Sequence, residues 1–347
     1  MRQKFLCTIL LILLLFTLCV SCNNDELDTI KIRIPWLHQA QYAGVYVAKE
    51  KGFFKKYGIE EVEILQGGPN IRPVDLVSSG SEHFSITGSM PFFNAYKEGR
   101  PIKVIATLDQ KHAYCYFARA DQNIDEPKDF KGERVAHKVA HEHNLEALLK
   151  SAGLTKQDIK LVPVPPGMSL FFTDDPEKMV PIWAGHAADE PLKSIERGID
   201  VNYFFPEDYD GKPRIGNILF TSKDFEKKHP EIVEGVVKGI LEAWYYSFNN
   251  LDEAVDITMK YMKGTDADKK HQKNMLIKMK DFMLIEKYGE KIGWSNQDKW
   301  GNAVENFVKN NKDASFSLNE ILTNKYVESF YNDDNVEYKT DIKKESS

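Results

Sequence analysis

Short strand patterns alternate with helix patterns along most of this chain, and few folds are compatible with that order. In the first unit, apolar or alternating runs predict strands over 30–34, 61–65, 83–87 and 102–108. The alternation then restarts, and further strands are expected over 133–137, 159–164, 180–183, 201–205 and 218–220. Strands that alternate with helices predict an α/β fold with mostly parallel, doubly wound sheets.

From Pro230 onward the pattern becomes helical, and apolar residues recur at helical spacing over 232–245. Two α/β units and a helical C-terminal section predict two lobes with a cleft between them. We expect lobe 1 to comprise residues 30–115 and 216–342, including the C-terminal helices, and lobe 2 to comprise residues 116–215.

The chain begins with the pattern of an export signal. Arg2 and Lys4 stand before an uncharged run over 5–20. A basic start followed by an apolar run is typical of a secretory signal, and this run is shorter than the ~20 residues that span a bilayer. The sequence therefore predicts an exported protein.

A cysteine follows a small residue at the end of this run. Ser21 precedes Cys22, as at the cleavage site of a bacterial lipoprotein, although a Leu is more usual where Cys19 stands. We predict a lipoprotein signal peptide over 1–21, a lipid on Cys22 and a tether over 22–29. The expected location is membrane-anchored, on the periplasmic side or at the cell surface. Cleavage without a lipid and an uncleaved anchor are the alternatives.

Charge, cysteine content and motifs exclude several classes of protein. The chain has 46 Lys and Arg against 52 Asp and Glu, a formal net charge of −6, so no nucleic-acid partner is expected. With Cys22 lipidated, only Cys115 remains as a free thiol beyond the leader, which leaves no intramolecular disulfide. The sequence has no Gly-x-Ser-x-Gly elbow, His-Glu-x-x-His pair or dinucleotide fingerprint. These features favour a binding protein without a cofactor over an enzyme.

Aromatic and polar residues gather after the first predicted strand. In an open α/β sheet, ligands collect beyond the carboxyl ends of the strands. Trp36 and Tyr42 can stack on a flat ring, and His38 and Gln39 can bond to polar atoms on its edge. For each residue alone, core packing or a place on the surface is the alternative.

Other strand ends of the first unit add polar groups. Gly68 and Asn70 can bring backbone N–H groups close to a ligand, although a tight turn also needs glycine and no P-loop spacing follows. Ser89 follows the third predicted strand, where it can bind ligand or cap the next helix. Gln110 follows the fourth strand and carries the same ambiguity.

Three histidines of the second unit raise the question of a metal. His137, His141 and His143 lie close in sequence, but neither a Cys nor a dense carboxylate set accompanies them. We expect no metal site. Hydrogen bonding of His137 and His141 to a ligand at a helix N-terminus is the favoured role, and a solvated loop is the alternative.

Trp183 and Glu190 are the other candidates of the second unit. Trp183 offers a second stacking surface near the end of a predicted strand. Glu190 stands where a helix begins, so it can accept hydrogen bonds from ligand amino groups or simply stabilise that helix end.

Sequence motifs spread over nearly the whole mature chain point to one family. The longest motif is the run Gln39-Ala40-Gln41-Tyr42-Ala43-Gly44-Val45-Tyr46-Val47-Ala48-Lys49-Glu50-Lys51-Gly52-Phe53-Phe54. Shorter motifs follow it along the chain: Gly67-Gly68-Pro69, Ser79-Gly80, Gly99-Arg100-Pro101-Ile102, Asp129-Phe130-Lys131-Gly132, Asp189-Glu190-Pro191, Trp244-Tyr245-Tyr246, 250–254 and Thr323-Asn324-Lys325-Tyr326. With these motifs the chain resembles the thiamine-pyrimidine-precursor family of ABC-importer solute-binding proteins and fungal pyrimidine-synthase relatives. The resemblance implies the type II periplasmic binding fold, whose two α/β lobes close on a ligand.

The resemblance also implies a function. It implies a substrate-binding lipoprotein of an ABC importer, a monomer that takes up a small heteroaromatic solute such as a thiamine pyrimidine precursor, with a permease and an ATPase as partners. The family extends to riboflavin, sulfonate and nitrate binders, and relatives have a glycine and small polar residues where this chain has 137–143. The ligand therefore stays open. A synthase-like enzyme and a sensory binding module are the alternatives; the fungal enzymes use pyridoxal phosphate and a cysteine-rich motif, which this chain does not contain.

Overall fold

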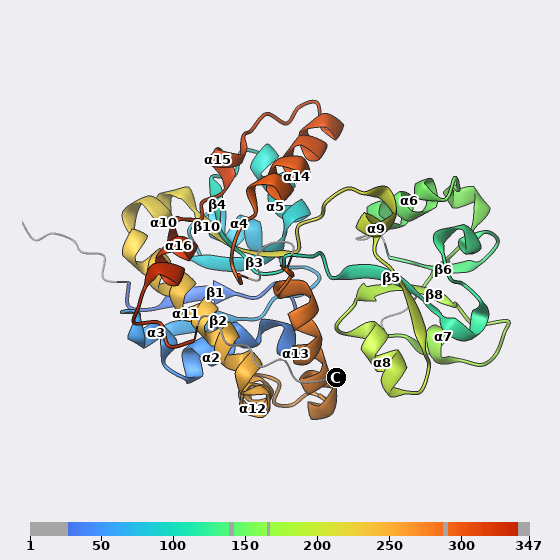
Figure 1. Cartoon of the computed structure of the whole chain (residues 1–347), viewed down its shortest axis with the longest axis horizontal. Coiled ribbons are helices and arrows are strands. Elements are labelled where there is room, and N and C mark those ends of the chain that lie inside the picture. Colours follow the sequence, from blue (N-terminus) through green and yellow to red (C-terminus); the bar gives the residue numbers. More distant parts are fainter. Residues whose placement is uncertain (1–26, 139–141, 165–166, 287–290, 339–347) are drawn as a thin grey trace, which may run out of the picture.

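The computed structural model describes residues 27–138, 142–164, 167–286 and 291–338. These residues form two five-stranded sheets that lie side by side, each covered by helices (Figure 1). We call each sheet with its helices a lobe. The strand order is β2-β1-β3-β10-β4 in lobe 1 and β7-β6-β8-β5-β9 in lobe 2. The predicted α/β class and the two doubly wound lobes are confirmed.

The sheet of lobe 1 combines four parallel strands with one antiparallel strand. Its strands are β1 (Ile30–Arg33), β2 (Val62–Leu65), β3 (Phe84–Gly88), β4 (Ile102–Thr107) and β10 (Asn217–Ser222). Strand β1 pairs in parallel with β2 and β3, whereas β10 runs antiparallel between β3 and β4. Alternation in β1 buries Ile30 and Ile32 and leaves Lys31 and Arg33 half-buried, which fixes the register of this strand.

The sheet of lobe 2 has the same plan. Its strands are β5 (Tyr114–Arg119), β6 (Arg134–His137), β7 (Lys160–Pro163), β8 (Ile182–His186) and β9 (Val201–Phe204). Strand β6 pairs in parallel with β7 and β8, and β5 runs antiparallel between β8 and β9. Each lobe thus receives its antiparallel strand directly after the chain has crossed from the other lobe.

Helices cover both faces of the sheets, and their bounds are as follows. Lobe 1 carries η1 (Ala40–Tyr42), α2 (Ala43–Glu50), α3 (Phe53–Lys56), α4 (Pro73–Ser78), α5 (Ser89–Lys97), α10 (Lys223–Lys228), α11 (Pro230–Asn249), α12 (Leu251–Tyr261), α13 (Lys269–Met283), α14 (Gln297–Asn310), α15 (Leu318–Ile321) and α16 (Lys325–Asn332). Lobe 2 carries η2 (Ala120–Gln122), η3 (Pro127–Phe130), α6 (Glu142–Ser151), η5 (Lys156–Asp158), α7 (Ser169–Phe172), α8 (Glu190–Glu196) and α9 (Pro206–Asp210).

The long helix α11 is the centre of the core of lobe 1. It packs on α2, α3 and α16, and its apolar side chains are buried. A glycine permits the closest approach: a Cβ added at Gly44 would lie 2.5 Å from the Trp244 ring. The helical C-terminal section expected from the sequence is therefore an integral part of lobe 1.

Two connections carry the chain between the lobes, over 108–113 and 211–216. They lie side by side, because the backbone N–H groups of Leu108 and Asp109 both donate to the carbonyl of Asn217, at 2.9 and 3.1 Å. The lobes are thus joined at a paired connection, which we call the hinge.

Two strands differ from the sequence-based expectation. Strand β5 was not predicted, because its residues Cys115 to Ala118 are buried on both faces and show no alternation. Strand β8 begins two residues later than expected, since Pro181 has no N–H group to donate to the ladder. As a result Trp183 lies inside β8 and not beyond its end.

Candidate functional site

A cavity of about 570 Å³ lies between the lobes beside the hinge, and we call it the hinge cavity. Both lobes and both connections contribute to its walls. The lining residues are Gly88, Ser89, Met90, Pro91, Asn94, Asp109, His112, Ala113, Tyr114, His143, His186, Gly216 and Asn217. Its position follows the general rule for α/β sheets, because the carboxyl ends of β3 and β8 meet there.

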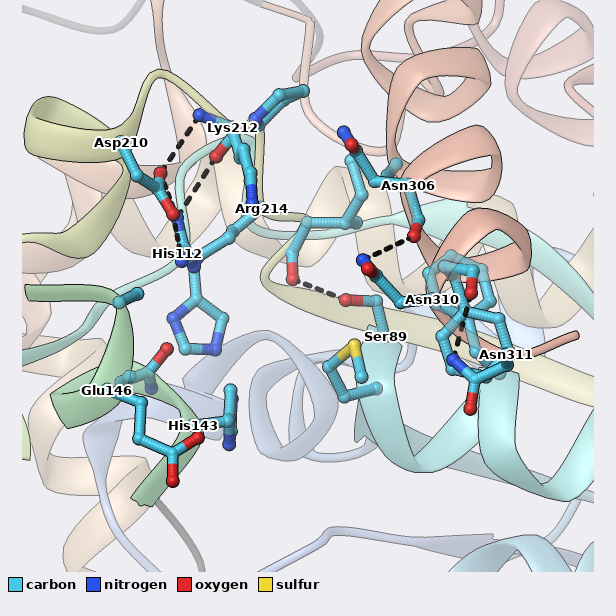
Figure 2. A pocket seen from close by; sticks show the side chains of 18 of the residues that line it. Ser89, His112, His143, Glu146, Asp210, Lys212, Arg214, Asn306, Asn310 and Asn311 are labelled. Carbon is cyan, nitrogen blue, oxygen red and sulfur yellow. Dashed lines mark hydrogen bonds and ion pairs between the residues drawn. The ribbon is translucent and has the colours of Figure 1, made fainter. Parts of the chain in front are cut away.

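A side cavity of about 460 Å³ adjoins the hinge cavity (Figure 2). The two cavities share Ser89, Met90, His112 and His143 as lining residues. Helix α14 faces the side cavity from lobe 1, and α6 faces it from lobe 2. Arg214 also lines it, but its guanidinium is held by both carboxylate oxygens of Asp210 at 2.8 Å.

The lobe 1 wall of the hinge cavity is the start of α5. Strand β3 ends at Gly88 and α5 begins at Ser89, whose hydroxyl donates to the carbonyl of Ile215 at 2.8 Å. The expectation that Ser89 caps this helix is wrong, because Gly88 holds the N-cap position and the Ser89 hydroxyl turns to the second connection. Ser89 therefore ties β3 to the hinge at the edge of the cavity.

The hinge itself contributes a buried carboxyl group. Asp109 is almost fully buried, and its Oδ2 accepts hydrogen bonds from the side-chain and backbone N–H groups of Asn217, at 2.7 and 3.3 Å. Burial raises the pKa of Asp109 to about 7, against the opposing effect of these bonds. The cavity thus contains an acid that gains or loses its proton near neutral pH.

Two histidines of the hinge cavity have buried ring nitrogens without a partner. Nε2 of His186 and Nδ1 of His112 find no hydrogen-bond partner among the described residues. Burial lowers the pKa of His186 to about 4. Burial, together with Arg214 and the neighbouring histidines, lowers the pKa of His112 to about 3. Both rings are therefore neutral at pH 7.

Trp183 and Glu190 form a group with Lys138 beside the cavity. The Lys138 ammonium lies 5.7 Å from the Trp183 ring centroid and 3.4 Å from Glu190 Oε1. The other oxygen of Glu190 accepts the backbone N–H of His186 at 2.8 Å. Burial and the neighbouring Asp189 raise the pKa of Glu190. Trp183 is 1% exposed, and its indole N–H has no partner among the described residues.

The lobe 1 candidates after β1 lie apart from the two cavities. Trp36 is 43% exposed, whereas Tyr42 is buried. His38 is half-buried, with Nδ1 3.0 Å from the hydroxyl of Tyr46, and burial lowers its pKa. Gln39 is half-buried beside it.

The remaining sequence candidates have varied positions. Gly68 is buried and Asn70 is exposed, both after β2. Gln110 is buried and donates to the carbonyl groups of Thr107 and Trp294, so its amide holds backbone in place. His137 lies at the end of β6, with Nε2 4.0 Å from Glu142. His141 and Cys22 lie outside the described residues.

Of the candidate residues that the structure describes, Ser89 lines the hinge cavity, and Glu190 and Trp183 stand next to it. The sequence analysis did not select Asp109, His112, His186 or Asn217. One signal was present: Asp109 and His112 follow the fourth strand of the first unit, where the chain crosses between lobes. His186 was not recognised because the strand before it was placed two residues early.

Helix α13 belongs to lobe 1 and also bonds to lobe 2. Within lobe 1, Gln272 Oε1 accepts the backbone N–H of Ala40 at 2.7 Å. One residue earlier, His271 is 4% exposed and lies between two carboxylates of lobe 2. Its Nε2 is 3.0 Å from Asp189 and its Nδ1 is 2.9 Å from Glu196. We call this arrangement the α13 clasp (Figure 1 shows α13 facing α8).

The electrostatics of the clasp favour a charged imidazole. Burial disfavours the charged ring, but the two carboxylates outweigh burial and raise the pKa of His271. Burial likewise opposes ionisation of Asp189, yet His271 and Lys193 hold its pKa at about 2. The clasp is therefore an ion-paired contact between the lobes.

A family model described as NMT1/THI5 like matches residues 39–254, which is more than half of the chain. The chain belongs to the NMT1/THI5-like family. The family resemblance drawn from the sequence motifs is thereby confirmed.

Named relatives of this NMT1/THI5-like chain bind small molecules. It is 23% identical to the riboflavin-binding protein RibY of Chloroflexus aurantiacus, over 88% of this chain and 87% of that protein. It is 22% identical to a formylaminopyrimidine-binding protein of Halalkalibacterium halodurans, over 75% of this chain and 79% of that protein.

The fold of this NMT1/THI5-like chain is that of the periplasmic binding proteins. The periplasmic aliphatic sulphonate binding protein SsuA from Escherichia coli matches it with a TM-score of 0.63 and 16% identity. The match covers 82% of this chain and 88% of SsuA. At this identity the likeness establishes the fold alone.

Two further findings concern the described residues of this NMT1/THI5-like chain. They contain no group of three or more His, Cys, Asp or Glu side chains placed to hold a metal ion. Among their helices, none is both long enough and apolar enough to span a membrane.

Proposed function

We propose that this chain is the solute-binding component of an ABC importer and takes up a flat nitrogen heterocycle, with a pyrimidine precursor of thiamine as the first candidate. The observation that carries the proposal is the hinge cavity, because it lies between two lobes and holds buried ring nitrogens without partners. Family membership supports it. So do the names of two relatives, since riboflavin and formylaminopyrimidine are both flat nitrogen heterocycles.

In this proposal the ligand lies between the start of α5 and the start of α8. Ser89 provides a hydroxyl on the lobe 1 side, and Glu190 accepts hydrogen bonds from ligand amino groups on the lobe 2 side. Trp36 stacks on the ring when the lobes close, and its 43% exposure leaves its face available. Trp183, which is buried, supports the site from lobe 2, and Tyr42, also buried, packs in the core.

The proposal includes the organisation expected from the sequence. Lobe 1 comprises 30–115 and 216–342, and lobe 2 comprises 116–215, except that Tyr114 and Cys115 belong to β5 of lobe 2. The lobes close on the ligand about the hinge, and exclusion of water strengthens the hydrogen bonds inside. A permease and an ATPase receive the solute, and a lipid on Cys22 holds the protein at the membrane.

Calorimetric titration of the purified full chain with formylaminopyrimidine and riboflavin tests this function. We expect saturable binding of at least one of the two. Loss of a charged acceptor costs about 1.5–3 kcal/mol, so Glu190→Gln should weaken binding about tenfold or more. Trp36→Ala removes a stacking surface and should also weaken binding.

The exposed Glu60 provides a matched control for the Glu190 variant. Glu60→Gln should leave the affinity unchanged, and thermal melts should show all three variants folded. Failure of both heterocycles to bind, or unchanged affinity in both site variants, would overturn the proposal.

A further inference from the structure

The hinge cavity is lined by hydrogen-bonding groups from both lobes and both connections. Ser89 and Asn217 belong to lobe 1, His186 belongs to lobe 2, and Asp109 and His112 belong to the hinge. A ligand held here would contact both lobes and the hinge at once. The chemistry of these groups therefore restricts which ligand can be enclosed.

The tautomer of His186 follows from its backbone contact. Its Nδ1 accepts the backbone N–H of Ala188 at 3.3 Å, so Nδ1 carries no proton. A neutral imidazole has one protonated nitrogen, which here must be Nε2. This Nε2–H is buried, and among the described residues no atom accepts from it. Buried donors in native proteins are nearly always paired, so this N–H needs an acceptor, which a ligand in the cavity can supply.

The charges around the cavity disfavour an anion. The described lining residues of the hinge cavity include no Lys or Arg. Three basic side chains near it are already paired: Lys111 lies 3.2 Å from the Asp208 carboxylate, Arg214 is paired with Asp210, and Lys138 lies 3.4 Å from Glu190. Burial keeps the rings of His112 and His186 neutral, and Asp109 adds a negative charge once it ionises.

We propose that the hinge cavity selects a solute with no net charge, and that the Nε2–H of His186 is the specificity-determining donor to a carbonyl oxygen or ring nitrogen of that solute. This inference rests on the function proposed above and narrows its ligand class. Nitrate or a sulfonate would bring negative charge next to Asp109, and the described lining of the hinge cavity has no Lys or Arg to balance it. A neutral heterocycle instead supplies the acceptor that the buried donor needs.

The test compares four probes by calorimetry on the full chain: formylaminopyrimidine, riboflavin, nitrate and ethanesulfonate. We expect at least one heterocycle to bind at least a hundredfold tighter than either anion. His186→Ala should weaken heterocycle binding tenfold or more, and His186→Gln, which keeps an N–H donor, should weaken it less. His229→Ala is the matched control, since His229 packs against Phe225 in lobe 1, and it should leave the affinity unchanged.

A second measurement needs no ligand. Nitrogen NMR of the ligand-free chain with ¹⁵N-labelled histidine should show His186 protonated on Nε2, and protonation on Nδ1 would overturn its role as donor.

The outcomes separate the two proposals. If a heterocycle binds and His186→Ala leaves its Kd unchanged, the role of His186 is overturned and the importer function stands. If an anion binds tighter than both heterocycles, the uncharged ligand class is overturned. If no probe binds, the proposed function is overturned together with the ligand class, and the NMR tautomer decides the His186 donor independently.

Discussion

Two tryptophans that the sequence analysis treated alike have opposite environments. Trp183 is 1% exposed inside β8, and its ring meets Phe171 edge-on at 6.3 Å. Trp36 is 43% exposed after β1. A sequence shows which residues are aromatic, but whether a ring is buried or exposed depends on where the strand begins and ends.

The difference between the tryptophans can be measured as stability. Trp183→Ala should lower the free energy of unfolding by about 3–5 kcal/mol, because it leaves a large cavity in the core. Trp36→Ala should change it by about 0.5 kcal/mol or less, as is usual for an exposed side chain. Urea denaturation measures both values, and equal losses in the two variants would contradict these placements.

The strand-end rule selected Ser89, which lines the hinge cavity, and at the next strand end it selected Gln110 in place of the neighbouring Asp109. The sequence analysis chose Gln110, yet Asp109 lines the hinge cavity while the Gln110 amide holds the carbonyls of Thr107 and Trp294. Successive side chains of an extended segment point to opposite sides, so a shift of one residue exchanges ligand side for core side. Sequence alone does not determine which of two successive side chains faces the ligand.

Cys22 carries the prediction about the membrane. The small residue before it and the apolar run predict cleavage and lipid attachment at this cysteine. Cys22→Ala should release the protein from the membrane fraction of cells, whereas Cys115→Ala, which changes a buried thiol, should not. Mass spectrometry of the mature N-terminus checks the lipid, and a mature chain that begins elsewhere without a lipid would contradict the prediction.

At the scale of elements, the strands with clear patterns were predictable. Strand β1 alternates and was found, and the β3–α5 junction has a glycine and a helix start that define it. Strand β5 was missed because a central strand buried on both faces has no alternation to read. Its antiparallel direction follows from the crossing between lobes, which the sequence analysis predicted near this point, but its place between β8 and β9 is known only from the folded chain.

The α13 clasp is an element-scale feature whose strength depends on pH. The pKa of His271 is raised by its two carboxylate partners. Because the pKa of His271 is higher in the folded state, the clasp stabilises the fold fully below the ordinary His pKa of about 6.5. This stabilisation is lost as the pH rises through the raised pKa. The stability of the protein should therefore fall from pH 6 to pH 9 by more than that of His271→Ala.

The free energy that the clasp contributes to stability is that of hydrogen bonds between charged groups. His271→Ala should lower the free energy of unfolding by about 1.5–3 kcal/mol at pH 6, measured by urea denaturation. Lys273→Ala, two residues along the same helix in an exposed ion pair with Asp252, should cost about 1 kcal/mol or less. A pH profile of His271→Ala parallel to that of the unmodified chain would argue against a charged clasp.

At the scale of the whole molecule, the order of strand and helix patterns was enough to predict two α/β lobes. The restart of the alternation marks the second lobe, and the helical tail returns to the first (Figure 1). A cleft between the lobes was expected, but the clasp and most of the residues that line the two cavities could not be predicted, because they come together from segments distant in sequence. His271 and Asp189, for example, are 82 positions apart.

Closure of the lobes predicts a change in overall size. Small-angle X-ray scattering of the full chain at saturating formylaminopyrimidine should give a smaller radius of gyration than the ligand-free chain. The reason is that a ligand held by both lobes favours the arrangement in which they approach each other. Glu190→Gln at the same ligand concentration should show a smaller change, and an unchanged profile at saturation would count against hinge closure.

A crystal structure of the full chain with formylaminopyrimidine locates the ligand directly. We predict density for the ring in the hinge cavity, between the ends of β3 and β8, with an acceptor atom about 2.7–3.2 Å from Nε2 of His186. Density outside the cleft between the lobes, or a His186 ring that makes no contact with the ligand, would contradict the proposed binding site.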